Sequence, residues 1–120
     1  MPDLPPPTAS FPAARRLKHR REMAAVFAKG KVAADDVLVV HALRSDSQLT
    51  RLGLSVAKKV GNAPQRNRWK RLIRESFRQH YQQLPSHLLL VVRPRKGATA
   101  DFQAIRQSLQ RLSRRLDRKL

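Results

Sequence analysis

Residues 66–78 read RNRWKRLIRESFR, and six of these thirteen positions are Arg or Lys. When the stretch is wound as an α-helix, at about 100° per residue, its apolar side chains gather in one arc. The members of that arc and its continuation are Trp69, Leu72, Ile73, Ser76, Phe77, His80 and Leu84. On the other side, Asn67, Arg71, Arg74 and Arg78 recur at i, i+4, i+7 and i+11, with Lys70 beside them. The pattern predicts a helix with one core-facing side and one cationic side.

The cationic side would destabilise this helix if the helix were isolated. Lys70 with Arg74, and Arg74 with Arg78, are like-charge pairs one turn apart, and each destabilises an isolated helix by about 0.2–0.5 kcal/mol. Glu75 is the only acid in the stretch, and we expect it to pair with Arg71. A solvated charged face is the ordinary explanation of such a row, but a helix selected for stability alone would carry more acids. The row therefore favours a polyanionic partner, RNA or DNA.

The start of this helix is also suited to an anion. Asn62 followed by Gln65 is a capping-box pattern, and Pro64 is tolerated in a first turn. Lys58 and Lys59 precede the cap, and Arg66 and Arg68 follow it. The free backbone N–H groups and the helix dipole favour negative charge there, and guanidinium groups bind phosphate bidentately. We expect the helix to run from about residue 63 to residue 83, with Pro85 ending it.

The remaining patterns predict the rest of the fold. A short helix over residues 21–29 ends at Gly30 and places Met23, Val26 and Phe27 on one face. Strands are expected over residues 37–43, 51–58 and 87–93, the last an unbroken apolar run that suggests a strand covered on both faces. A last helix covers residues 101–120. The order is helix, two or three strands, helix, strand, helix, which predicts an α/β two-layer sandwich with a small mixed sheet.

Composition limits the possible functions. The 120 residues suit one domain, predicted over residues 15–120 after a Pro-rich, disordered tail over residues 1–14. The net charge of +18, from 26 basic against 8 acidic residues, favours nucleic acid as a partner. No cysteine is present, which fits a reducing cytosol, and neither a membrane span nor a secretory signal is recognisable. His19, His41, His80 and His87 lack metal-ligand spacing, and no Ser/His/Asp order suggests a hydrolase.

Two segments carry a resemblance. Gly53-Leu-Ser-Val-Ala-Lys-Lys-Val-Gly-Asn-Ala63, followed by the stretch from Arg66 to Arg78, resembles the bacterial ribonuclease P protein component, whose signature is this RNR box. The resemblance covers roughly residues 15–120. It implies three strands before the central helix, a left-handed βαβ crossover, and a fold similar to the second domain of the fifth small-subunit ribosomal protein. Topology rules alone would favour a right-handed crossover.

The resemblance also implies a function. The protein would be the accessory subunit of ribonuclease P, an endoribonuclease that removes the 5′ leader of precursor tRNA. Its catalytic RNA would carry the chemistry, with Mg²⁺ bound chiefly by RNA and substrate. One protein per RNA, in the cytoplasm, is expected. The implied RNA-binding residues are Lys58, Lys59, Asn62, Arg66, Asn67, Arg68, Lys70, Arg71, Arg74 and Arg78; those of the leader-binding cleft are Met23, Phe27 and His41. Neither catalytic nor metal-binding residues are assigned to the protein.

Some alternatives stay open at this point. Met23 and His41 stand where the family often has aromatic residues, so stacking on leader bases is expected to be weaker. Phe27 is either a core residue or a leader contact, and Trp69 is expected in the core. Asp35 and Asp36 are read as turn residues. The basic residues of the last helix, Arg106, Arg111, Arg114, Arg115, Arg118 and Lys119, form a second RNA-facing surface or a solvated edge. A ribosomal RNA-binding protein is the competing functional class.

Overall fold

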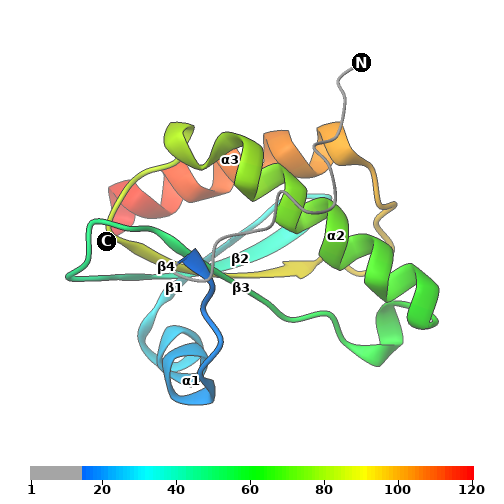
Figure 1. The fold of residues 1–120 in the computed structure, drawn as a ribbon, viewed down its shortest axis with the longest axis horizontal. Helices are drawn as coiled ribbons and strands as arrows, with labels where there is room; N and C mark the ends of the chain where they lie inside the picture. Colours follow the sequence, from blue (N-terminus) through cyan, green and yellow to red (C-terminus); the bar gives the residue numbers. More distant parts are fainter. Residues whose placement is uncertain (1–14) are drawn as a thin grey trace.

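The computed structural model describes residues 15–120, so the predicted Pro-rich tail over residues 1–14 lies outside the described residues. Three helices and four strands follow one another in the order of Figure 1. They are α1 (Arg20–Lys29), β1 (Lys31–Ala34), β2 (Leu38–Arg44), β3 (Arg51–Leu54), α2 (Ala63–His80), β4 (Leu88–Pro94) and α3 (Phe102–Lys119), with short 3₁₀ turns η2 (Lys58–Val60) and η3 (Tyr81–Gln83) on either side of α2. The predicted α/β fold with three strands before the central helix is confirmed.

The sheet is mixed, with the strand order β1-β2-β4-β3. β1 pairs with β2, and β2 with β4, in antiparallel fashion, whereas β3 and β4 are parallel. Parallel neighbours need a crossover connection, and α2 supplies it. β4 is therefore a central strand, as its unbroken apolar run predicted, and Leu88, Leu90, Val91 and Val92 are fully buried in it.

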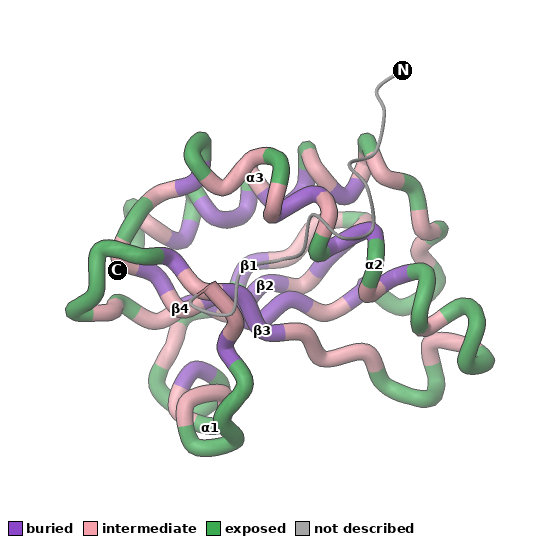
Figure 2. The backbone as a smooth tube through the Cα atoms, viewed as in Figure 1, coloured by how far each residue is buried: buried purple, intermediate pink, exposed green. Residues whose placement is uncertain are grey.

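The main core lies between one face of the sheet and the layer formed by α2 and α3 (Figures 1 and 2). Trp69, Leu72, Ile73 and Phe77 of α2 are buried, in agreement with the predicted arc. Ile105, Leu109, Leu112 and Leu116 bury the inner side of α3. Because the apolar side of each helix packs against this core, its opposite side faces outward.

α1 covers the other face of the sheet (Figure 1). A small cluster holds it there, with Leu17, Val26 and Val91 buried and Met23, Leu43 and Leu89 packed around them. The chain reaches α1 along the free edge of β3, where the Leu17 N–H donates to the Leu52 carbonyl at 2.9 Å. Gly53 permits this approach, because a Cβ there would lie 3.3 Å from the Leu17 Cβ.

Two predicted boundaries are wrong. β3 ends at Leu54 and does not continue to Lys58, which instead begins the η2 turn. The reason lies in β4: the Ser55 N–H donates to the Val92 carbonyl, and the next parallel bond would need an N–H on Pro94, which proline lacks. The α-helical part of the central helix ends at His80, and the last three predicted residues form η3.

Asp35 lies in the β1–β2 turn, as predicted, and it connects this turn to α3. Its carboxylate accepts the N–H groups of Val37 and Leu38, the Ser108 hydroxyl, and the guanidinium of Arg111. Burial raises the pKa of Asp35, but these four donors outweigh burial and lower the pKa to about 2. The carboxylate is therefore ionised at neutral pH and contributes to the folded state.

Candidate nucleic-acid interface

The start of α2 has the reciprocal cap that the sequence predicts. The Gln65 N–H donates to Asn62 Oδ1 at 2.9 Å, and the Asn62 N–H donates to Gln65 Oε1 at 2.8 Å. A Cβ on Gly61 would collide with the Gln65 side chain that closes this box. Lys58 and Lys59 are exposed in the turn just before the cap. The cap thus fixes where the cationic helix begins relative to these two lysines.

The cationic side of α2 is turned away from the core. We call Asn67, Arg71, Arg74 and Arg78 the α2 row. Its first three members are exposed, and Arg68 is exposed at the opposite edge of the helix. Lys70 and Arg66 are partly buried. Arg66 Nε is enclosed yet has no hydrogen-bond partner among residues 15–120.

The expected pairing of Glu75 with Arg71 is wrong. Glu75 instead binds Arg78, one turn further on, at 3.1 Å between carboxylate and guanidinium. Side chains on a helix lean toward its N-terminus, so Arg78 leans onto Glu75 whereas Arg71 leans away from it. Only 18% of the Arg78 side chain is exposed, and its charge is largely matched. Arg71 forms no ion pair with any described residue.

An additional cation reaches the α2 row from outside the helix. Burial lowers the pKa of Arg74, and the charge of Arg16 lowers it further. Arg16 lies in the segment that bridges to β3, where Leu52 is its partner. Its neighbour Arg15 is held by the fold, with its guanidinium 3.8 Å from the Tyr81 ring centre. Residues 15–21 are basic in sequence, but the strand-edge pairing that brings Arg16 to Arg74 carries no local signal.

The surface between α1 and the sheet contains the predicted leader residues. Phe27 is 43% exposed and is therefore not a core residue. Its ring meets that of His41 edge-on, with the centroids 4.7 Å apart. Met23 is half-buried against the small cluster beneath α1. We call Met23, Phe27 and His41 the Phe27 surface; it lies across the sheet from the α2 row (Figure 1).

The surroundings of His41 favour the neutral form of its imidazole. Burial lowers its pKa, and the nearby charge of Arg93 lowers it further. The register places Arg93 opposite Val39, two residues from His41 on the same side of the sheet. His41 Nε2 is buried without a partner among the described residues. His41 therefore supports the exposed Phe27 ring edge-on, while its Nε2 is enclosed.

Two hollows flank the start of α2. One, of about 320 Å³, is lined in part by Lys59, Arg93, Arg95 and Lys96. The other, of about 410 Å³, includes Arg68 and the edge of Trp69, which is otherwise buried as predicted. Neither hollow has an acidic residue in its lining. The loop at residues 93–97 contains three basic residues, but its position beside Lys59 depends on the β3–α2–β4 crossover.

Among residues 15–120, no three His, Cys, Asp or Glu side chains gather as metal ligands would. Within the same residues, no helix combines the length and hydropathy that crossing a bilayer requires. The described acids are largely engaged: Glu22 binds Arg51, Asp35 binds Arg111, Glu75 binds Arg78, and Asp117 binds Arg44. The cationic residues on the outer side of α2 thus have few acids to balance them.

A small basic α/β protein whose helix layer presents unmatched guanidinium groups is the class that this fold and surface define. The family model for ribonuclease P matches residues 11–117. The chain belongs to the ribonuclease P protein family, and it is a protein component of that tRNA-processing ribonucleoprotein.

Individual relatives agree with this assignment. The ribonuclease P protein component of Thermotoga maritima is 34% identical over 115 residues, covering 92% of this chain and 98% of the relative. That of Brevibacillus brevis is 41% identical over 102 residues, covering 83% and 81%. The solved structure of the Thermotoga maritima protein has a TM-score of 0.77 over 83% of this chain and 96% of its own, at 34% identity. A Staphylococcus aureus ribonuclease P protein at 32% identity has a TM-score of 0.72, covering 82% and 91%.

Proposed function

We propose that the protein binds the catalytic RNA of ribonuclease P through the α2 row and the residues around its cap, and holds the 5′ leader of precursor tRNA on the Phe27 surface. The RNA carries out the endonucleolytic cleavage that produces the mature 5′ end. The observation that carries this proposal is the outward row of guanidinium groups, of which Arg71 has no counter-charge in the described structure. A phosphate backbone supplies that counter-charge and releases bound counterions.

The RNA-binding set is Lys58, Lys59, Asn62, Arg66, Asn67, Arg68, Lys70, Arg71, Arg74 and Arg78. Its members share the cap or the solvent side of α2, apart from the partly buried Arg66, Lys70 and Arg78. Asn62 contributes indirectly, because its side chain is engaged in the capping box. Arg78 contributes least, because Glu75 already holds it. The main grip on RNA is therefore assigned to the cap and the first three turns of α2.

The Phe27 surface suits a single strand. Unstacked bases pack on exposed aromatic rings, and such stacking is worth about 1–3 kcal/mol per base. Phe27 offers an exposed ring, and the His41 ring supports it edge-on at 4.7 Å between centroids. Because this surface and the α2 row lie on opposite sides of the sheet, one protein can contact the catalytic RNA and the leader together. The proposed stoichiometry is one protein per catalytic RNA, in the cytoplasm.

The acidic side chains of residues 15–120 do not form a cluster that would suit Mg²⁺. Magnesium prefers several oxygen ligands in octahedral geometry, with carboxylates and phosphates foremost. Four of the acidic side chains in residues 15–120 are committed to arginines, and no cluster of ligands forms among them. We assign the Mg²⁺ ions of the reaction chiefly to the RNA subunit and substrate. The role of the protein is then to neutralise phosphate repulsion and to grip the substrate.

The test is cleavage of precursor tRNA by the cognate catalytic RNA at low Mg²⁺ concentration, with and without the protein. The expected result is a clear stimulation of cleavage that fades as Mg²⁺ is raised, because cations and protein relieve the same repulsion. A ribosomal or other structural RNA-binding protein of equal charge is the control. Absence of stimulation, or equal stimulation by the control protein, would reject the proposed function.

A further inference from the structure

The outer side of α3 repeats the spacing of the α2 row. Gln107, Arg111, Arg114 and Arg118 recur at i, i+4, i+7 and i+11, which is the spacing of Asn67, Arg71, Arg74 and Arg78. We call these four residues of α3 the α3 row. In both helices the row lies opposite the buried side, and both helices belong to the same layer over the sheet (Figure 1). The two rows therefore face outward from the same side of the molecule.

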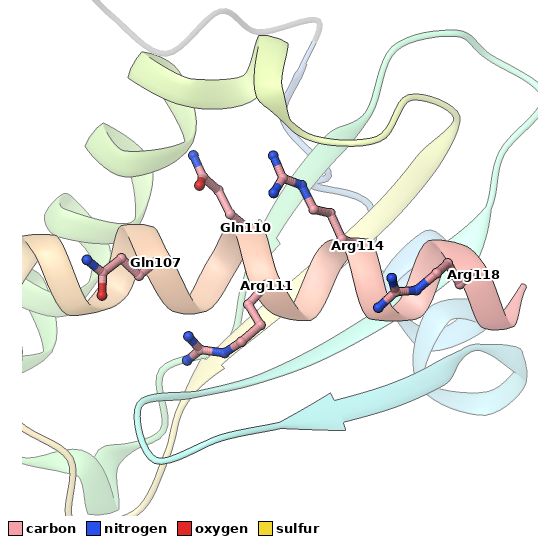
Figure 3. A pocket seen from close by; sticks show the side chains of 5 residues that line it. All are labelled: Gln107, Gln110, Arg111, Arg114 and Arg118. Carbon is pink, nitrogen blue, oxygen red and sulfur yellow. The ribbon is translucent and has the colours of Figure 1, made fainter.

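The side chains of the α3 row line a shallow hollow. Together with Gln110 they enclose about 350 Å³. In Figure 3, Gln110 and Arg114 point toward the end of α2, and Arg111 points to the opposite side of α3. The hollow thus presents guanidinium and amide groups from both flanks of one helix. Its lining consists of three arginines and two glutamines and includes no acid.

The positive charge of this surface is only partly balanced within the described structure. Asp117 is the only acid within α3, and its carboxylate binds Arg44 at 2.7 Å. Asp35 binds Arg111. Arg118 is exposed and forms no ion pair with any residue from 15 to 120, and Arg114 reaches only the Gln83 carbonyl, at 3.5 Å. Arg115 and Lys119 add two more exposed cations nearby.

The spacing of these groups fits a phosphate backbone. With a rise of about 1.5 Å per residue, Arg114 and Arg118, which form no ion pair among residues 15–120, lie about 6 Å apart along the helix, and Arg111, already paired with Asp35, extends the row to about 10 Å. Double-helical RNA has a wide, shallow minor groove that proteins recognise by shape, through phosphates and 2′-hydroxyl groups. Guanidinium groups suit the phosphates, and the glutamine amides can donate to or accept from the hydroxyl groups. An outward helix of this composition matches that groove without requiring a base sequence.

We propose that the α3 row is a second contact for the phosphate backbone of the catalytic RNA, in addition to the α2 row. This inference rests on the proposed function. The occupant is assigned to the catalytic RNA because α3 and α2 lie side by side in one layer: the amide of Gln110 on α3 donates to the side chain of Gln83 at 2.7 Å, in the η3 turn just after α2. The leader, in contrast, is assigned to the Phe27 surface across the sheet.

The experiment measures binding to the catalytic RNA alone over a range of salt concentrations. The test variant is Arg114→Gln/Arg118→Gln, which removes two charges while keeping polar side chains of similar reach. The matched control is Lys29→Gln/Lys31→Gln, which removes two exposed lysines from the α1 and β1 side. The comparator Arg71→Gln/Arg74→Gln removes two charges from the α2 row. Since Arg118 has no ion pair among residues 15–120 and Arg114 only a long bond, the test variant is expected to fold normally, which thermal unfolding checks.

The slope of log affinity against log salt is negative, and its magnitude (below, the slope) is expected to fall by about 1.4–1.8 in the test variant, since each lost phosphate contact removes about 0.7–0.9. The α2 comparator should do the same, and the lysine control should change the slope much less. If the comparator lowers the slope but the test variant matches the lysine control, the α3 contact is rejected and the proposed function stands. If the test variant weakens only the binding of precursor tRNA to the assembled enzyme, the assignment to the catalytic RNA is wrong. If no variant changes the slope and the protein does not stimulate cleavage, both proposals fail.

Discussion

Arg71 and Arg78 belong to the same row on α2 but differ in their surroundings, and this difference predicts unequal contributions to RNA binding. Arg71 is exposed and has no ion pair within residues 15–120, whereas Arg78 is bound to Glu75 at 3.1 Å with 18% of its side chain exposed. An arginine that is already paired with a carboxylate carries little unbalanced positive charge, so it neutralises a phosphate less effectively. Arg71→Gln should therefore weaken binding of the catalytic RNA more than Arg78→Gln.

The magnitude follows from counterion release. Loss of one phosphate contact lowers the magnitude of the negative slope of log affinity against log salt (again called the slope) by about 0.7–0.9. Between 50 and 200 mM salt, a slope lower by about 0.8 corresponds to about a threefold smaller fall in affinity. We expect this full change for Arg71→Gln and much less for Arg78→Gln. Glu75→Gln frees Arg78, so it should instead raise the slope and tighten binding at low salt.

The assay is a filter-binding or fluorescence titration of the catalytic RNA at four or more salt concentrations, with thermal unfolding of each variant as the control for folding. Equal slopes for Arg71→Gln and Arg78→Gln would refute the reasoning, because the ion pair would then not determine the available charge. A slope that falls for Glu75→Gln would refute it independently.

Three further predictions concern other parts of the chain. Phe27→Ala should weaken the binding of precursor tRNA by about 5- to 160-fold, equivalent to about 1–3 kcal/mol of lost stacking, and leave the binding of mature tRNA nearly unchanged; equal losses on both RNAs would contradict a leader contact. Asp35 has a folded pKa of about 2 against 3.8 ordinarily, so its contribution is complete above about pH 4 and is lost as the pH falls toward 2. Protonation of Asp35 should therefore lower the free energy of unfolding by about 2 kcal/mol in the wild type but not in Asp35→Asn. If the free energy of unfolding depends on pH in the same way in both proteins, this role of Asp35 is rejected. Asn62→Ala should cost about 1 kcal/mol of stability in chemical denaturation, and Asn62→Asp should restore most of it; an unchanged midpoint for the alanine variant would show that the cap is dispensable.

The sequence correctly predicted those features of the fold that depend on residues close together in the chain. Asn62, Pro64 and Gln65 predicted the start of α2 to the residue, because capping depends on neighbours three positions apart. The apolar run in β4 predicted a strand covered on both faces. The residues of the α2 row were also predicted, because helical periodicity alone separates the buried side from the outer one.

Features that depend on tertiary contacts were not predictable in the same way. β1 is an edge strand with Lys31 and Val32 exposed, so its four residues lack the alternation that identifies a strand. The pairing of Glu75 depended on side-chain direction, which spacing alone does not settle. The exposure of Phe27 depended on how α1 packs on the sheet, and the sequence left core and contact equally open.

The cluster beneath α1 is small, with only Leu17, Val26 and Val91 buried in it. The larger core on the opposite side of the sheet contains the buried sides of both α2 and α3. Because local opening is easiest where little apolar surface is buried, α1 should detach from the sheet at a lower free energy than global unfolding requires. Amide hydrogens of α1 would then exchange with deuterium well before those of β4. A transiently released α1 would let an incoming leader strand slide beneath Phe27 while the grip on the catalytic RNA persists.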